Sequence, residues 1–376
     1  METKKYTMRD YIASCPEIMR DNIKKSEELT KALVDEYVDG GYKNVWIVAC
    51  GSSSNGSYCG RMYVKHHLKC ECKVVNPFTF ITAENDIGPE DMVVAVSQSG
   101  YSTNALEALD VIKSKGRKTI GLTGDVNSDF KEKCDVLVNW GVGTETVAYV
   151  TRGVTTLALF FMLFALEAAK KKGYESEEEY SKNKAQLLKA CDINEEVQKN
   201  WTEFMKKHYK RLSSMTNAYM CSVGANMGTA YEGALKFGET ISIPTAAYEA
   251  EEYIHGPNIQ LTPKYSVFVI DGGIGSGRLK NIYEGTRIVT DNAFLITNTE
   301  YEGDENIFYV KADVDEDVTP ICYLPIFQIT AADITDDLNR WIKHPLQEKM
   351  DKYVSAKSEN YDKSPFALDT PKRHEK

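Results

Sequence analysis

One carboxylate and one imidazole in the second half of the chain are spaced so that they could share proton-transfer chemistry. Glu239 and His255 bracket the segment GETISIPTAAYEAEEYIHGP, which predicts a helix end followed by a loop that brings the two side chains together. A carboxylate can act as a base at a carbon beside a carbonyl or imine, and an imidazole titrates near neutral pH. The pair therefore indicates an enzyme that moves protons, although each residue alone also suits an ordinary surface or turn position.

Two serine-rich turns in the first half are candidate anion sites. They are CGSSSNGS at residues 50–57 and SQSGYST at residues 97–103, and each follows an apolar run that predicts a strand. A strand that ends in such a turn before a helix exposes N–H groups and hydroxyls at the positive end of the helix dipole. One turn alone would indicate a helix N-cap, but two with this density of hydroxyls favour a phosphate group. The candidate ligands are Gly51, Ser52, Ser53, Ser97, Ser99 and Ser102.

The elements that must position these residues follow a repeated order of strand, turn and helix. We expect N-terminal helices over residues 1–43, a first α/β domain over 44–186, a second over 187–330, and a C-terminal helix and tail over 331–376. Residues 170–186 are interpreted as a highly charged helix that connects the two halves, and residues 333–354 as an amphipathic helix. Strands that alternate with helices predict parallel sheets covered on both faces. The strand and turn from Val45 resemble those from Ala218, which indicates two related domains.

Composition narrows the class of protein. The chain has 376 residues and a net charge of −10, which argues against sequence-independent binding of nucleic acid. The apolar segment 153–169 falls short of the roughly 20 residues that cross a bilayer, and it predicts a buried core helix. Its N-terminus shows no secretory signal and its nine cysteines are scattered, so we expect a cytoplasmic protein with reduced thiols. Neither a nucleotide-binding glycine motif nor metal-ligand spacing is visible.

Five segments give the chain a resemblance to the sugar isomerase (SIS) family, and specifically to its double-domain members. They are ACGSSSN at 49–55, SQSG at 97–100, ETVAYVTRGVTTL at 145–157, YEGALKFGE at 231–239 and HGP at 255–257. The resemblance covers roughly residues 44–354 and is strongest to the isomerase half of glucosamine-6-phosphate synthase and to fructosamine-6-phosphate deglycases. It implies an α/β fold of two SIS domains, each a mainly parallel sheet flanked by helices in a flavodoxin-like three-layer sandwich, assembled as a homodimer or higher homo-oligomer.

The resemblance also implies roles for individual residues. The positions that hold the sugar phosphate are Ser53, Ser97, Gln98, Ser99 and Ser102, and Ala148 falls near the sugar. Glu239 matches the carboxylate that moves a proton between C1 and C2. His255 matches an imidazole associated with ring opening, which can come from the neighbouring subunit, and Lys236 matches a lysine near the glutamate. The synthase forms an imine through a C-terminal lysine, for which Lys352 and Lys376 are the candidates.

Two departures from the synthase pattern weaken the interpretation of the chain as a synthase. Tyr101 stands where the synthase has an acidic residue, and the ammonia-producing glutaminase domain has no counterpart in these 376 residues. The expected reaction converts a 6-phosphofructosyl-amine, such as a fructosyl amino acid 6-phosphate, through a 1,2-enaminol to glucose 6-phosphate and the free amine, with no cofactor or metal. The alternatives are an aldose-ketose isomerase, an ammonia-dependent aminosugar-phosphate synthase or deaminase, and a non-catalytic sugar-phosphate sensor. No nucleic acid or membrane partner is expected.

Overall fold

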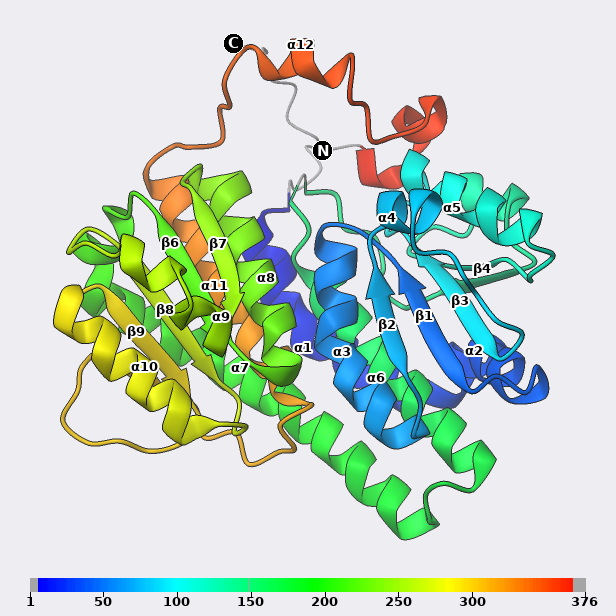
Figure 1. The fold of residues 1–376 in the computed structure, drawn as a ribbon, viewed down its shortest axis with the longest axis horizontal. Helices are drawn as coiled ribbons and strands as arrows, with labels where there is room; N and C mark the ends of the chain where they lie inside the picture. Colours follow the sequence, from blue (N-terminus) through cyan, green and yellow to red (C-terminus); the bar gives the residue numbers. More distant parts are fainter. Residues whose placement is uncertain (1–5, 148, 368–376) are drawn as a thin grey trace, which may run out of the picture. The chain divides into compact units, whose positions relative to one another are not determined.

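The chain divides into two compact units, each built on its own sheet (Figure 1). The computed structural model describes residues 6–147 and 149–367. Unit 1 is made of the residues up to Lys184 together with those from Ile342, and unit 2 is Ala185–Trp341. Unit 2 is therefore inserted in the sequence of unit 1.

The sheet of unit 1 is parallel and has the strand order β2-β1-β3-β4-β5. Its strands are β1 (Asn44–Val48), β2 (Cys72–Val75), β3 (Asp91–Val96), β4 (Ile120–Thr123) and β5 (Val136–Asn139). In the register, Val48 of β1 lies between Val75 of β2 and Ala95 of β3. The chain leaves β1 toward one edge of the sheet and β3 toward the other, so the turns that follow these two strands flank a topological switch point, where ligands bind in such sheets.

Helices cover both faces of this sheet. They are α1 (Met8–Lys24), α2 (Ser26–Asp39), α3 (Ser52–Leu68), α4 (Pro77–Thr82), α5 (Thr103–Ser114) and α6 (Arg152–Lys172). α6 is apolar all round and packs against α1, α2 and α3, as the sequence predicted for a core helix. On the opposite face, Phe80 of α4 and Leu109 and Ile112 of α5 pack against the strands.

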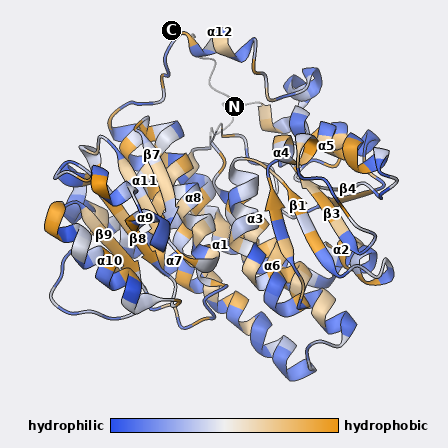
Figure 2. Ribbon diagram, in the orientation of Figure 1, coloured by the Kyte–Doolittle hydropathy of each residue, from blue (hydrophilic) through white to orange (hydrophobic). Residues whose placement is uncertain are grey.

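Unit 2 has the strand order β10-β9-β8-β6-β7. Read in reverse, from β7 to β10, this order is the same as that of unit 1, so the two sheets share a topology. Its strands are β6 (Ala218–Ser222), β7 (Thr245–Glu249), β8 (Ser266–Asp271), β9 (Ala293–Thr297) and β10 (Ile307–Tyr309). Its helices are α8 (Met227–Lys236), α9 (Ala250–Ile254), α10 (Ser276–Val289) and α11 (Thr319–Asp337). Val267 and Val269 join the core with α9 and α10, and Phe268, between them, meets the rings of Phe237 and Phe327 edge-on. Figure 2 shows the hydrophobic residues of both units gathered on the strands. The predicted class of two mainly parallel α/β sheets is confirmed.

Three elements differ from the expectation. The charged helical connection expected over residues 170–186 is present but begins later and is longer: α7 (Glu177–Ser213) is one continuous helix that passes from unit 1 into unit 2. β7 lies where a loop was expected. The helix expected over residues 333–354 is interrupted: α11 ends before Asn339, which is left-handed (φ 49°), and Pro345 precedes the short α12 (Gln347–Asp351). A left-handed residue ends a helix, and proline disfavours helix at the residue before it.

Candidate active site

The serine turn of unit 1, residues 97–103, gathers hydroxyls between the end of β3 and the start of α5. The Ser97 hydroxyl donates to the Ser102 hydroxyl at 3.0 Å and accepts from the Gly100 N–H at 3.2 Å. Gly100 has φ 73°, and a Cβ added there would lie 1.8 Å from Ser128 Oγ. Only glycine fits this close, left-handed turn. The turn is thus held by its own serines and by the absence of a side chain at Gly100.

The turn after β1 lies beside the serine turn because β1 and β3 are paired strands. Gly51 has φ 58° and precedes α3, whose first residues, Ser52 and Ser53, are partly exposed. No cap side chain accepts from the first N–H groups of α3, which leaves this end of the helix dipole available to an anion. The side chain of Asn104, in the first turn of α5, donates to Cys50 Sγ at 3.3 Å and links the two turns.

A lysine near the C-terminus reaches the serine turn. Lys357 forms an isolated antiparallel bridge with Ser102, and the Ser358 N–H donates to the Tyr101 carbonyl at 2.9 Å. The Lys357 ammonium donates to Ser99 Oγ at 2.9 Å and to Ser102 Oγ at 3.3 Å. Burial lowers the pKa of Lys357 below its ordinary value, and the neighbouring Cys50 offsets part of this change. The turn therefore offers an amine as well as hydroxyls.

The segment that carries Lys357, residues 355–367, is anchored on unit 1, and we call it the C-terminal strap. Asp129 accepts from Ser358 Oγ at 2.6 Å and from Asn360 Nδ2 at 3.0 Å. The ring of Tyr361 meets that of Tyr101 edge-on, with 6.0 Å between centroids. Phe366, farther along, is buried. These contacts fix the backbone on both sides of Lys357, so its position does not depend on the ammonium contacts alone.

Sequence reasoning missed Lys357. The structure places Lys352 at the end of α12 with its side chain exposed, and among the described residues it is Lys357 that contacts the serine turn. Lys376 and Ala148 lie outside the described residues. A signal for Lys357 was present: its neighbours Ser355, Ala356 and Ser358 are small, which suits a segment that packs closely against a turn.

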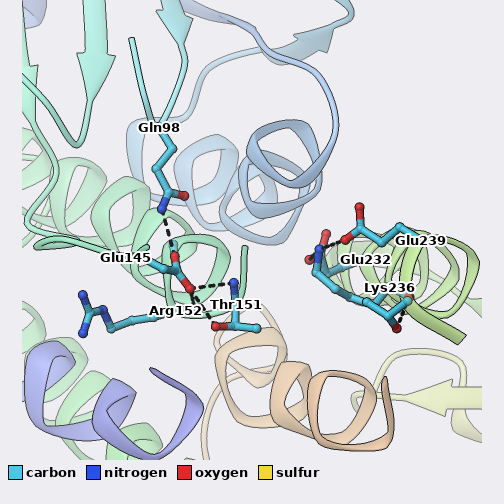
Figure 3. A network of polar contacts seen from close by, with 9 residues as sticks. Gln98, Glu145, Thr151, Arg152, Glu232, Lys236 and Glu239 are labelled. Atoms are coloured by element: carbon cyan, nitrogen blue, oxygen red, sulfur yellow. Dashed lines mark hydrogen bonds and ion pairs between the residues drawn. The ribbon is translucent and has the colours of Figure 1, made fainter. Parts of the chain in front are cut away.

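In unit 2, Glu239 belongs to a buried cluster of charges at the end of α8. It lies in a π-helical turn, η3 (Phe237–Ile241), a rare irregularity often found at functional sites. Lys236, one turn earlier, donates to Glu239 and lies 3.2 Å from Glu232 Oε1 (Figure 3). Lys236 and Glu232 are fully buried, while 28% of the Glu239 side chain is exposed. Burial by itself lowers the pKa of Lys236, but the two carboxylates outweigh it and raise that pKa above its ordinary value. Lys236 is therefore a charged donor that orients Glu239.

His255 ends α9 and is exposed to solvent. Its Nδ1 lies 2.6 Å from the Glu251 carbonyl, so this contact, and not one with Glu239, fixes the ring. The structure thus does not join Glu239 and His255 as the intervening sequence suggested. Within residues 6–147 and 149–367, no group of three or more His, Cys, Asp or Glu side chains is arranged to hold a metal ion.

Unit 2 has a carboxylate where unit 1 has its serine turn. β8 corresponds to β3 in strand order and ends at Asp271. Asp271 Oδ1 accepts from the Gly273 N–H at 2.9 Å and from Ser276 Oγ at 2.8 Å, and Oδ2 accepts from Thr297 Oγ1 at 2.8 Å. Asp271 accepts the hydrogen bonds that these N–H and hydroxyl groups could otherwise donate to a phosphate, and its negative charge repels an anion. The two sheets share a topology, but the donors suited to phosphate lie in unit 1.

Comparisons with known proteins agree with this geometry. The family model of the SIS domain matches residues 42–166. The chain is 29% identical over 243 residues to a glutamine–fructose-6-phosphate aminotransferase (isomerizing) of Clostridium perfringens, which covers 64% of this chain and 39% of the relative. It is 26% identical over 349 residues to the enzyme of the same name from Aquifex aeolicus, covering 91% of this chain and 56% of the relative. The chain thus spans about two-fifths to just over half of the length of these relatives.

Two solved structures share the fold along nearly the whole chain. A proposed phosphosugar isomerase from Clostridium difficile 630 superposes with a TM-score of 0.84 and 24% identity, covering 94% of this chain and 99% of that one. The C-terminal domain of a glucosamine-fructose-6-phosphate aminotransferase from Francisella tularensis gives a TM-score of 0.76 and 19% identity, covering 89% and 96%. Residues 42–166, which match the SIS domain, lie in the first sheet unit, and the second sheet has the same strand order, so the two units fit two SIS domains.

Proposed function

We propose that the chain is a phosphosugar enzyme that releases glucose 6-phosphate and a free amine from a 6-phosphofructosyl-amine. The observation that carries the proposal is the serine turn of unit 1, where the hydroxyls of Ser99 and Ser102 meet the amine of Lys357. A phosphate monoester needs several donors and a cation, and this turn offers both. The phosphate end of the substrate is assigned to this turn.

The proton shift is assigned to Glu239. In the open-chain substrate, C1 carries the amine and C2 the carbonyl. Glu239 takes a proton from C1, which gives the 1,2-enaminol, and returns a proton to C2, which leaves an imine at C1. Water adds to the imine, and the amine departs as the C1 aldehyde of glucose 6-phosphate forms. No cofactor is consumed. Lys236, which donates to Glu239, keeps the carboxylate directed for this role.

Lys357 and His255 have supporting roles in this proposal. The Lys357 ammonium, which donates to Ser99 and Ser102, supplies the positive charge that the phosphate group needs. The exposed imidazole of His255 can assist ring opening, either in its own chain or in a second copy of the chain within a homo-oligomer. The curated relatives are named as isomerizing aminotransferases of fructose 6-phosphate, which supports a phosphorylated ketose substrate. We expect the reaction to take place in the cytoplasm.

The test is product analysis by NMR and mass spectrometry. Purified protein is incubated with fructosyl-lysine 6-phosphate, and separately with fructose 6-phosphate with and without ammonia. We expect glucose 6-phosphate and lysine from the first substrate, and a loss of about 10²–10⁴-fold in rate for Glu239→Gln and for His255→Ala. Glu203→Gln on the exposed face of α7 is the control and should keep the wild-type rate.

The other outcomes assign different functions. Turnover of fructose 6-phosphate alone would indicate an aldose-ketose isomerase. Turnover only with ammonia would indicate an aminosugar-phosphate synthase or deaminase. Binding of sugar phosphates without turnover of any substrate would indicate a sensor, and each of these results would overturn deglycation.

A further inference from the structure

Glu145 is a buried carboxylate to which neither the sequence nor the proposed reaction gives a role. Only 2% of the residue is exposed. The guanidinium of Arg152, the nearest cation in sequence, is directed elsewhere, toward Ser14 Oγ at 3.2 Å and the Thr144 carbonyl at 2.7 Å. A buried charge is costly unless hydrogen bonds compensate it. The hydrogen-bond partners of Glu145 therefore indicate its role.

Most of these partners belong to the first turn of α6. Glu145 Oε1 accepts from the Thr151 N–H at 2.8 Å, from Thr151 Oγ1 at 2.7 Å and from the Arg152 N–H at 3.0 Å, and Oε2 accepts from the Gly153 N–H at 3.0 Å. These N–H groups have no partner within the helix, and they form the positive end of its dipole. Glu145 is thus fixed rigidly at the N-terminus of the core helix of unit 1.

The remaining partner lies in the serine turn. Gln98, between Ser97 and Ser99, directs its amide toward Glu145, and its Nε2 donates to Glu145 Oε2 at 2.8 Å (Figure 3). The amide lies so close to α6 that a Cβ added at Gly153 would be 1.9 Å from Gln98 Oε1. The Gln98 carbonyl also accepts from the Gly124 N–H at 2.9 Å. Both the side chain and the backbone of this residue are therefore held from inside the fold.

We propose that Glu145 is a positioning residue for the phosphate group, acting through Gln98. It ties the middle of the serine turn to the N-terminus of α6 and so fixes the directions in which the flanking hydroxyls of Ser97 and Ser99 point. The Gln98 side chain serves as an internal anchor and not as a ligand. This inference rests on the proposed function only in placing the phosphate at the serine turn.

The test measures phosphate affinity directly. Calorimetry gives Kd for inorganic phosphate and for glucose 6-phosphate, and the kinetic assay gives KM and kcat for the phosphorylated substrate. We expect Glu145→Gln, which sets an amide group against the donors of Gln98 and Gly153, to weaken both Kd values and raise KM by about tenfold or more, with a smaller change in kcat.

Two further variants separate positioning from a general loss of structure. Gln98→Met removes the anchoring amide but leaves the hydrogen bonds between Glu145 and the N-terminus of α6. It should weaken phosphate binding as much as Glu145→Gln. Thr151→Val removes one hydrogen bond to the same carboxylate but leaves its bond with Gln98, so its phosphate Kd should stay near that of wild type.

The outcomes are distinguishable. If the wild-type protein binds neither inorganic phosphate nor glucose 6-phosphate, the assignment of phosphate to the serine turn is wrong, and the proposal about Glu145 is overturned with it. If the wild type binds and Gln98→Met binds equally well, Glu145 acts only as a helix cap and the proposal about positioning is wrong. Equal losses for Gln98→Met and Thr151→Val would also contradict it, because only the first variant breaks the link to the turn.

Discussion

Replacing Lys236 by Met leaves Glu232 as a buried carboxylate without its cation. Glu232 is fully buried and lies 3.2 Å from the Lys236 ammonium, and breaking such a pair costs about 3–5 kcal/mol of unfolding free energy. The contact between Lys236 and Glu239 adds little, because the Glu239 side chain is 28% exposed and can be hydrated once released. We therefore expect the loss to come mainly from Glu232 and to be confined to unit 2.

Hydrogen exchange of the β8 amides, followed by mass spectrometry, measures the unfolding free energy of unit 2 separately from that of unit 1. A loss of about 3–5 kcal/mol increases the exchange rate by about two to four orders of magnitude. The control is Lys206→Met, which breaks an ion pair with Glu203 on α7 in which both side chains are more than half exposed. That loss should stay below about 1 kcal/mol.

The double variant Glu232→Gln/Lys236→Met provides the decisive comparison. It removes the buried, uncompensated charge of Glu232, so its unfolding free energy should exceed that of Lys236→Met alone by about 2 kcal/mol or more. With the fold recovered, kcat should remain low, because Glu239 has lost the donor that orients it. The reasoning is refuted if Lys236→Met costs less than about 1 kcal/mol, or if the double variant is no more stable than the single one.

Three further predictions concern unit 1. Gly100→Ala should abolish phosphate binding measured by calorimetry, because the new Cβ meets Ser128 Oγ in a left-handed turn, and unchanged affinity would show that the turn is not the site. The Kd for glucose 6-phosphate, measured by calorimetry against pH, should rise with a midpoint below pH 10.5, since burial lowers the pKa of the Lys357 ammonium; a midpoint at or above this pH would contradict the burial. Asp129→Asn weakens the anchor at Ser358 and should make strap amides exchange faster while those of β3 keep their rate; equal protection in both proteins would rule out the anchor.

Local sequence signals predicted most of the fold. The strands of both sheets, β7 excepted, are short apolar runs, most of which end in Gly- or Ser-containing turns, and α6 is apolar on every side, so its burial was evident. β7 was missed because all five of its residues are half-buried at the edge of a sheet, which gives no alternation of apolar and polar residues. α7 was expected only as far as residue 186, although farther along it Leu187, Cys191, Asn194, Val197 and Trp201 are buried at helical spacing.

The site was predictable where it is local in sequence. The hydroxyls of the serine turn, and Glu239 with Lys236 one helical turn before it, follow from spacing along one segment. The contact of Lys357 with Ser99 joins positions 258 residues apart, and it depends on the strap returning to unit 1 after unit 2 is complete. Glu145 was likewise hidden, because its partner Gln98 lies 47 residues away on another element. The spacing of residues along the chain does not predict such long-range contacts.

The insertion of unit 2 into unit 1 has a consequence for the order in which the protein is made. A ribosome releases the serine turn and every strand of the first sheet before it begins unit 2, and it releases Lys357 only after unit 2 is finished. A nascent or truncated first unit therefore has the hydroxyls without the amine. Completion of the anion site therefore follows completion of unit 2.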